Sequence, residues 1–245
     1  MIGLGTIVNT AAIVTGGILG TVIKSGLPQR YKHIIMQAIG LSVLVVGISG
    51  ALQGMYKVAN DGTISREFIT VMIFSLVIGS IIGEFINIED KLDKMGLWIQ
   101  KKFIKGESDF AQGFVTASLV YCVGAMAIVG SLEDGLMGNT NTLFAKSILD
   151  GVSAIVFAAT MGIGVTFSAI PVLVYQGSIT LLAGFVKPWL TVGVISQMSL
   201  VGSILILGIG LTMLEIKKIK VGNMLPSIFL PFIFYIFQKL LDIIF

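Results

Sequence analysis

The sequence predicts an all-α fold, a polytopic transmembrane helix bundle with about eight spans. Hydrophobic residues form 55% of the 245 residues and charged residues only 12%, which is about half the charged share of a typical soluble domain. Runs such as 34–55 and 192–214 carry no charge. They match the roughly 20 residues that a helix needs to cross a hydrocarbon layer of about 30 Å. We expect residues 1–245 to form a single transmembrane domain.

The spans are apolar runs that end at charged clusters, glycines or prolines. The fifth and sixth spans follow one another with almost no loop, and Gly162 and Gly164 mark the turn between them. An even number of spans leaves both termini on one side of the membrane. We expect the spans at residues 3–23, 34–55, 68–87, 111–132, 143–163, 165–185, 192–214 and 223–243.

The positions of Lys and Arg orient these spans, because cytoplasmic loops of membrane proteins carry an excess of positive charge. The odd-numbered loops together hold eleven of the sixteen cations, and the other side holds five. This asymmetry predicts that the odd-numbered loops are cytoplasmic and that both termini lie outside.

Residues 88–105 predict a cytoplasmic amphipathic helix lying at the membrane interface. Apolar residues recur there at helical spacing, charged residues occupy the other face, and Trp98 lies between two Lys-containing turns. The helix is either a connector that rests on lipid or a surface for a partner. Residues 106–109 would cap the helix of the fourth span.

Glycines recur inside the spans at spacings that bring helix backbones together. Gly16, Gly17 and Gly20 lie in the first span, and two GxxxG pairs follow, one at residues 50–54 and one at 79–83. Small residues allow close helix contact in a membrane. The alternative is that these glycines expose backbone to a permeating solute.

Weak internal similarity suggests an inverted repeat of spans 1–3 and 6–8. Thr15 aligns with Gln176, and Pro28 aligns with Pro188 at nearly the same offset. Five spans separate equivalent members, so the two copies would face opposite ways. Inverted repeats are typical of transporters, whose binding sites lie near mid-membrane between the repeats.

Four segments carry a resemblance to a known family. They are YCVGAMAIVGSLEDG at 121–135, KSILDG at 146–151, PVLVYQG at 171–177 and GTIVNT at 5–10. The chain resembles the YdfK/YqgA-like family of bacterial inner-membrane proteins, a domain of unknown function, over nearly its whole length. The resemblance implies a bacterial cytoplasmic membrane protein and is compatible with transport. It implies no substrate and no catalytic residue.

Asp150 is the most deeply placed charge, about two turns into the fifth span. Lys146 lies four residues before it, and Ser153 shares the same helix face. Because an ionisable group inside a bilayer costs about 2.5–3.5 kcal/mol at the centre, it needs a reason to be there. Two readings stay open: an ion pair that holds helices together, and a water-lined site for an ion or solute.

Other polar residues extend this candidate site. Glu133 and Asp134 end the fourth span, where paired carboxylates could attract a cation. Asn9 in the first span needs a partner helix or a ligand for its amide. In the sixth span Tyr175 and Gln176 follow Pro171 by about one turn, which predicts a discontinuous helix with exposed carbonyls.

These features favour a transporter of a small solute or ion, coupled to a cation such as Na⁺ or H⁺. The alternatives are an ion channel and a non-transporting membrane partner or assembly protein. No enzyme is expected, because the sequence contains neither HExxH nor GxSxG. One cysteine and one histidine predict no metal site and no cofactor. The expected partners are the lipid bilayer, the transported species and, compatible with the sequence, further copies of the chain, but no nucleic acid.

Overall fold

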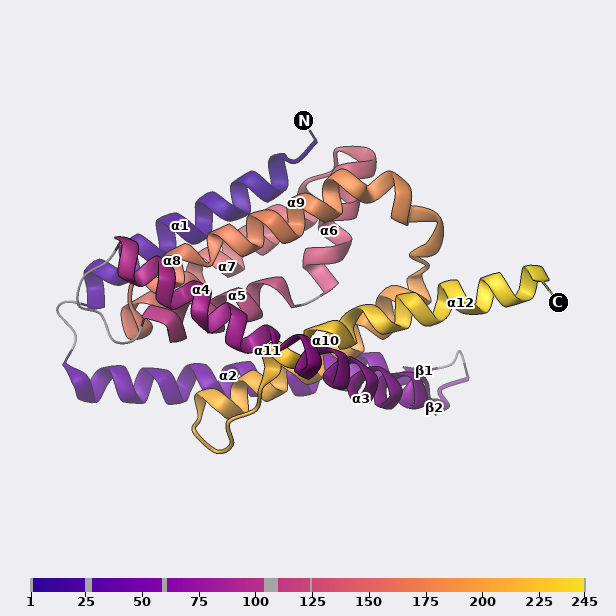
Figure 1. Cartoon of the computed structure of the whole chain (residues 1–245), viewed down its shortest axis with the longest axis horizontal. Coiled ribbons are helices and arrows are strands. Elements are labelled where there is room, and N and C mark those ends of the chain that lie inside the picture. The colour runs from indigo at the N-terminus through magenta and orange to yellow at the C-terminus, as the bar shows by residue number, and fades with distance from the viewer. Residues whose placement is uncertain (1, 25–27, 59–60, 104–109, 124, 245) are drawn as a thin grey trace. The chain divides into compact units, whose positions relative to one another are not determined.

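In the computed structural model the chain is almost entirely helical (Figure 1). The structure describes residues 2–24, 28–58, 61–103, 110–123 and 125–244. Contacts between Cα atoms divide the chain into two compact units, each made of two stretches of sequence. The first unit comprises Met1–Ile39 and Asp90–Phe185, and the second comprises Gly40–Glu89 and Val186–Phe245.

In the residues that the structure describes, the first unit contains helices and no strand. The long α2 (Gln29–Met55) begins in this unit and continues into the second. The other helices are α1 (Leu4–Lys24), α4 (Ile88–Phe103), α5 (Phe110–Cys122), α6 (Ala125–Met137), α7 (Asn141–Met161), the short α8 (Gly164–Phe167) and α9 (Ala169–Val186).

The second unit adds one small hairpin to its helices. The hairpin pairs β1 (Tyr56–Val58) with β2 (Ile64–Arg66) in antiparallel register, and Asp61 Oδ1 accepts from the backbone and hydroxyl of Thr63 in its turn. The fold class is all-α, as predicted. The helical elements are α3 (Ile69–Ile86), η1 (Lys187–Trp189), α10 (Val192–Met213), α11 (Val221–Met224), η2 (Leu225–Phe229) and α12 (Leu230–Ile244).

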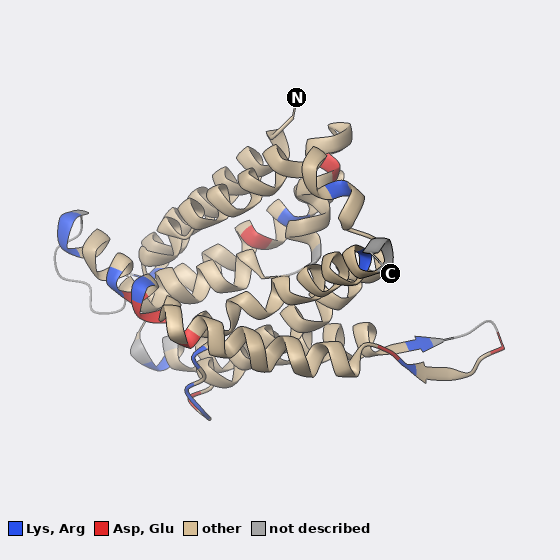
Figure 2. Cartoon of the chain, turned by 45° about the vertical axis from the view of Figure 1, so that its right-hand side comes forward, with Lys and Arg blue, Asp and Glu red and all other residues tan. Residues whose placement is uncertain are grey.

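The helices match the predicted spans closely. In the described part of the chain, seven helical segments are long and apolar enough to cross a membrane, and the bent pair α5–α6 makes an eighth if it counts as one span. Gly162, with φ +86°, turns the chain between the fifth and sixth spans as expected. Charged residues occupy mainly loops and helix ends (Figure 2).

The bent pair α5–α6 connects the two ends of the first unit. α5 begins beside Gly164, because a Cβ atom on that glycine would lie 2.0 Å from the Phe110 carbonyl oxygen. α6 ends beside the start of α1, where Asp134 accepts from the backbone of Gly3 and Gly5. α1 starts near one end of the unit, and Gly164 follows the turn at the other. This arrangement favours a broken span over a re-entrant loop, with the 61° bend next to Cys122.

Glycines bring α1 and α7 into backbone contact. A Cβ atom would lie 2.2 Å from the Gly151 carbonyl oxygen if built on Gly16, and 2.2 Å from the Ile155 carbonyl oxygen if built on Gly20. Residue numbers rise together along both helices, so α1 and α7 run parallel. Parallel packing is what the first and fifth of a series of alternating spans require.

In the second unit the two GxxxG pairs have the same role. Gly54 meets Leu200 on α10, and Gly83 meets the Asn223 carbonyl on α11. Gly50 and Gly79 continue these contacts one turn earlier, against Ser203 and Ser227. Residue numbers run in opposite directions in both helix pairs, as expected for spans 2 with 7 and 3 with 8. The close-packing interpretation of these glycines is therefore confirmed.

The predicted discontinuity of the sixth span after Pro171 is wrong. α9 runs unbroken from Ala169 to Val186, through Pro171, Gln176 and Gly177. Proline is tolerated here because it occupies the third position of α9, where a backbone N–H has no intrahelical acceptor within α9 itself. The break lies before Pro171, at Ser168, between α8 and α9.

Helix α4 confirms one further prediction, whereas the predicted inverted repeat is not tested. Residues 88–103 form the expected helix α4, with Ile99 buried and Trp98 exposed. The rest of that segment and the proposed cap at 106–109 lie outside the described residues. Thr15 is exposed and donates to the Ala11 carbonyl, whereas Gln176 is fully buried. The inverted repeat stays a prediction.

Candidate functional site

The centre of α7 carries a buried ion pair. Lys146 Nζ and Asp150 Oδ2 are 2.6 Å apart, and their side chains are only 8% and 9% exposed. They are four residues apart on one helix, so they face the same side. Asp150 lies about 14 Å along the 21-residue helix at 1.5 Å per residue, close to its midpoint.

Two amide side chains join α1 and α9 to this pair. Asn9 Nδ2 donates to Asp150 Oδ2 at 3.0 Å and to Gln176 Oε1 at 3.3 Å. Both Asn9 and Gln176 are fully buried. Asn9, Lys146, Asp150 and Gln176, called here the central cluster, therefore connect three helices.

The central cluster leaves two polar atoms without a protein partner. Asn9 Oδ1 and Gln176 Nε2 are buried and form no hydrogen bond with any residue that the structure describes. Exchanging the oxygen and nitrogen of either amide does not pair these atoms. The Asn9 nitrogen must face the Asp150 carboxylate, and a reversed Gln176 would turn its own nitrogen toward Asn9 Nδ2. A buried polar group left unpaired costs about 1–3 kcal/mol.

A second layer of unpaired hydroxyls lies one turn away. Thr6, Ser131 and Thr180 are buried, and their hydroxyl oxygens have no hydrogen-bond partner in the described part of the chain. The three come from adjoining helices, since Gly5 on α1 contacts Asp134 on α6, and Gly135 on α6 contacts the Thr180 carbonyl on α9. This hydroxyl layer was missed from the sequence. The signal available in the sequence was helical spacing, because Thr6 precedes Asn9 by three residues and Thr180 follows Gln176 by four.

Ser153 and Tyr121 lie on the other side of Asp150. Ser153 Oγ lies 3.0 Å from the Asp150 carbonyl and 3.4 Å from the Tyr121 hydroxyl. Tyr121 is almost fully buried and stacks on Phe157. It belongs to the last turn of α5, so the break of the fourth span lies close to the central cluster. Half-buried Tyr175 directly precedes Gln176 on α9.

The structure separates Glu133 and Asp134 from the central cluster. Asp134 is fully buried and caps α1 by accepting from the backbone of Gly3 and Gly5, both at 3.0 Å. A carboxylate at a helix N-terminus is stabilised by the unpaired N–H groups there. Glu133 accepts from the Thr142 hydroxyl at 2.6 Å. The adjacent carboxylates thus have different partners.

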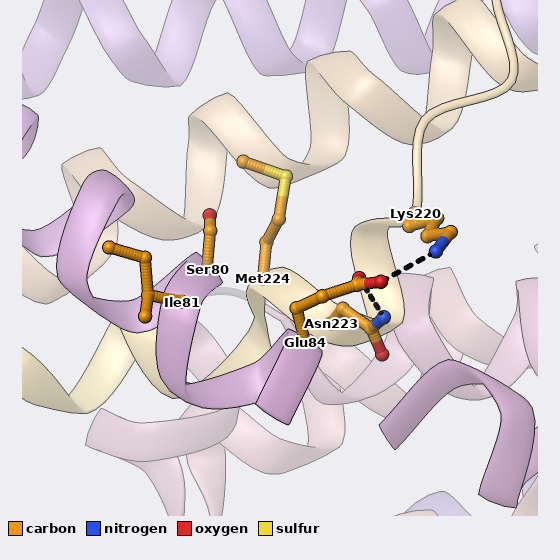
Figure 3. A pocket seen from close by; sticks show the side chains of 6 residues that line it. All are labelled: Ser80, Ile81, Glu84, Lys220, Asn223 and Met224. Atoms are coloured by element: carbon orange, nitrogen blue, oxygen red, sulfur yellow. Dashed lines mark hydrogen bonds and ion pairs between the residues drawn. The ribbon is translucent and has the colours of Figure 1, made fainter. Parts of the chain in front are cut away.

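The second unit holds a more exposed pocket of about 350 Å³ between α3 and α11. Glu84, Lys220 and Asn223 meet there with Ser80, Ile81 and Met224 (Figure 3). Glu84 accepts from Lys220 Nζ at 2.8 Å and from Asn223 Nδ2 at 2.6 Å. The Glu84 carboxylate raises the pKa of Lys220. Glu84 lies near the end of α3, and its side chain is 58% exposed.

Both units thus contain a carboxylate that accepts from a lysine and an asparagine. The pair in the first unit is buried at mid-span, and that in the second is open at a helix end. No group of three or more His, Cys, Asp or Glu is placed to hold a metal ion within the residues that the structure describes. The central cluster instead offers one free acceptor, one free donor and a neutralised carboxylate.

The fold and this cluster define a polytopic membrane protein with ionisable side chains in its apolar interior. The chain belongs to the family described as "Protein of unknown function (DUF554)", whose model matches residues 4–236. This confirms the resemblance found in the sequence.

Two relatives cover almost the full length. The chain is 36% identical over 227 residues to the uncharacterized membrane protein YdfK of Bacillus subtilis (strain 168), covering 93% of each. It is 29% identical over 232 residues to the uncharacterized protein YqgA of Escherichia coli (strain K12), covering 93% of this chain and 94% of YqgA. No solved structure matches the chain.

Proposed function

We propose that this protein is an integral membrane transporter for a small solute or ion, and that the transported species passes the central cluster. The observation that carries the proposal is the pair of unpaired amide atoms, Asn9 Oδ1 and Gln176 Nε2, beside a charged pair at mid-span. Substrate sites of membrane transporters lie near mid-membrane, where helices supply polar groups.

A purely structural role explains only part of the cluster. The bonds from Asn9 to Asp150 and Gln176 tether α1, α7 and α9. Tethering does not explain why the nitrogen of the fully buried Gln176 amide has no acceptor. It also does not explain the three unpaired hydroxyls of the hydroxyl layer. A solute or water that both donates and accepts satisfies these groups, which supports a site.

For the coupling ion, the geometry favours H⁺ over Na⁺. Lys146 already neutralises Asp150 at 2.6 Å, so a sodium ion at the same carboxylate would meet the ammonium group. A proton instead replaces the ion pair by a neutral carboxylic acid and releases Lys146. We place the protein in the bacterial cytoplasmic membrane with both termini outside, as the family and the charge asymmetry suggest.

The test begins with the purified protein in detergent. A thermal-shift screen of ions and small metabolites identifies stabilising compounds, because a ligand that binds the folded state raises its stability. Flux of each hit is then measured in proteoliposomes under a pH gradient and under a sodium gradient. We expect uptake driven by the pH gradient.

Two variants locate the pathway. Asp150→Asn and Gln176→Leu should abolish flux while the protein remains monodisperse. Glu84→Gln, in the exposed pocket of the second unit, is the matched control and should retain flux. Wild-type flux in both central variants would exclude the central cluster from the pathway. Unitary currents would instead favour a channel, and a stoichiometric co-purifying protein without any flux would favour a partner subunit.

A further inference from the structure

We propose that the central cluster binds a small monovalent anion together with a proton, and that the two cross the membrane in the same direction. The inference rests on the proposed function and adds the charge of the substrate and the direction of coupling. It follows from the way in which the cluster keeps its net charge at zero.

The donors of the central cluster already surround an anion, the chain's own carboxylate. Asp150 Oδ2 accepts from Lys146 Nζ at 2.6 Å and from Asn9 Nδ2 at 3.0 Å. The lysine comes from α7 and the asparagine from α1, and all three side chains are buried. Hydrogen bonds from an ammonium group and an amide are also those that hold an external anion. The Asp150 carboxylate therefore occupies a ready-made anion site.

The elements that contact α7 or the cluster add no charge to this pair in the part of the chain that the structure describes. The titratable groups on α5 and α9 are neutral at physiological pH, because free thiols and phenols lose a proton only near about pH 8.5 and 10. They are Tyr121, Cys122 and Tyr175. On α6, Glu133 and Asp134 have partners of their own. α1 contributes Asn9, and α8 has no ionisable residue.

Net charge decides which states of the cluster are accessible, because an uncompensated ion in an apolar interior is costly. The empty cluster is neutral, with Lys146 paired to Asp150. A proton alone would leave the ammonium group unpaired, and an anion alone would add a second negative charge beside the carboxylate. A proton on Asp150 and an anion on Lys146 together restore a net charge of zero. The two ligands therefore bind together.

The two unpaired amide atoms match this pair of ligands. Asn9 Oδ1 is an acceptor without a donor, and Gln176 Nε2 is a donor without an acceptor, among the described residues. A protonated Asp150 carries an O–H donor, and the Asn9 amide satisfies it by turning its oxygen toward the acid. The anion supplies the acceptor that Lys146 and Gln176 then lack. A proton and an anion thus provide the missing donor and the missing acceptor.

A cation fits the same surroundings less well. It would have to displace a proton from Lys146 and bind Asp150, at which Asn9 Nδ2 already directs a donor. Hard divalent cations take about six or more oxygen ligands. The central cluster has a single carboxylate, and the described ranges of the chain contain no group of three or more His, Cys, Asp or Glu placed to hold a metal ion.

Anion binding is tested first in Asp150→Asn, in which Lys146 has lost its carboxylate. The purified variant is titrated in detergent with sodium formate, nitrate or chloride, and sodium gluconate keeps the sodium concentration constant. We expect a small anion to raise the melting temperature equally at about pH 6 and about pH 8, because a bound ligand stabilises the folded state. The matched variant Lys146→Met/Asp150→Asn lacks the ammonium group and should not respond.

Coupling is tested in the wild-type protein. Where Asp150 is ionised in the empty site, one proton should be taken up per anion, so the affinity for the anion should fall about tenfold for each unit rise in pH. A pH indicator in weakly buffered solution measures the proton uptake directly. Lys220→Gln removes an exposed ammonium group of the second unit and should behave as wild type, which controls for anions bound at the surface.

The outcomes distinguish this inference from the proposed function. An Asp150→Asn protein that responds to anions no more than the double variant would overturn the anion site, even if a neutral solute is transported. Binding of a cation with release of protons would also overturn it. If Asp150→Asn does not fold, anion binding to wild type without proton uptake, or no anion binding at all, overturns the coupling. Coupled binding without flux of any anion would support the site and count against the transporter.

Discussion

Asn9 and Gln176 stand 167 positions apart in the sequence, yet Asn9 Nδ2 donates to Gln176 Oε1 at 3.3 Å with both side chains fully buried. The contact brings the first and sixth spans together at the level of Asp150. One amide from each helix, each with one unsatisfied atom, is an arrangement that neither helix could support alone.

Replacing one partner of the Lys146–Asp150 pair should destabilise the protein strongly, whereas replacing both partners should destabilise it little. Asp150→Leu leaves a buried ammonium unpaired and should destabilise the protein by about 3–5 kcal/mol, whereas the double variant Lys146→Met/Asp150→Leu should recover most of this loss. Thermal unfolding in detergent, followed by size-exclusion chromatography, measures both. A double variant no more stable than Asp150→Leu would show that the carboxylate stabilises the fold through Asn9 rather than through the lysine.

Gly16 should not tolerate alanine. The added methyl group would lie 2.2 Å from the Gly151 carbonyl oxygen, so α1 and α7 must separate, at a cost of at least about 1–3 kcal/mol. Gly177→Ala is the matched control, because nothing lies within 4 Å of a Cβ atom there. That variant should gain up to about 1 kcal/mol from helix propensity. Equal melting temperatures for the two variants would contradict the close contact of α1 with α7.

Asp134 should stabilise the start of α1. Asp134→Ala removes the acceptor for the Gly3 and Gly5 N–H groups and should cost about 1–2 kcal/mol. Asp134→Asn keeps one acceptor oxygen and should cost less. Hydrogen exchange at the first turn of α1, measured by mass spectrometry, should accelerate in the alanine variant. Unchanged exchange there would show that the carboxylate does not cap the helix.

The Glu84–Lys220 pair should show a defined pH dependence. Glu84 raises the pKa of Lys220 above its ordinary 10.5, so the pair contributes stability that is fully present below that value. The contribution is lost as the pH rises through the raised pKa. The melting temperature of wild type should exceed that of Glu84→Gln at pH 8, and the difference should shrink above pH 10.5. A difference that grows with pH would contradict the pairing.

The sequence predicted much of the candidate site but not its arrangement. Asp150, Lys146, Asn9 and Gln176 were found because hydrophilic side chains are rare in apolar spans and costly there. Thr6, Ser131 and Thr180 were missed, because a threonine or serine in a membrane helix usually donates to its own backbone. Whether it does so depends on the neighbouring helices. Ser178 and Thr180 are only two residues apart, yet the Ser178 hydroxyl donates to the Val174 carbonyl and the Thr180 hydroxyl has no partner in the described part of the chain.

Pro171 and the acidic pair show a second limit. A proline is disruptive in a helix interior and harmless in the first turn, and the position of the helix start decides between these effects. Glu133 and Asp134 are neighbours in sequence, but successive helical residues point about 100° apart, so they find different partners.

The amino-acid sequence by itself determined that this chain forms apolar membrane-spanning helices, where those helices lie and which family the chain belongs to, because hydrophobicity and charge are summed locally along the chain. Only the tertiary structure decided which buried polar atoms find partners. Asp134 becomes a helix cap, Asp150 becomes half of an ion pair, and Asn9 and Gln176 each keep one atom unsatisfied. Hydrogen bonding between helices is directional and depends on backbones approaching within a few ångströms, and no single span encodes that approach.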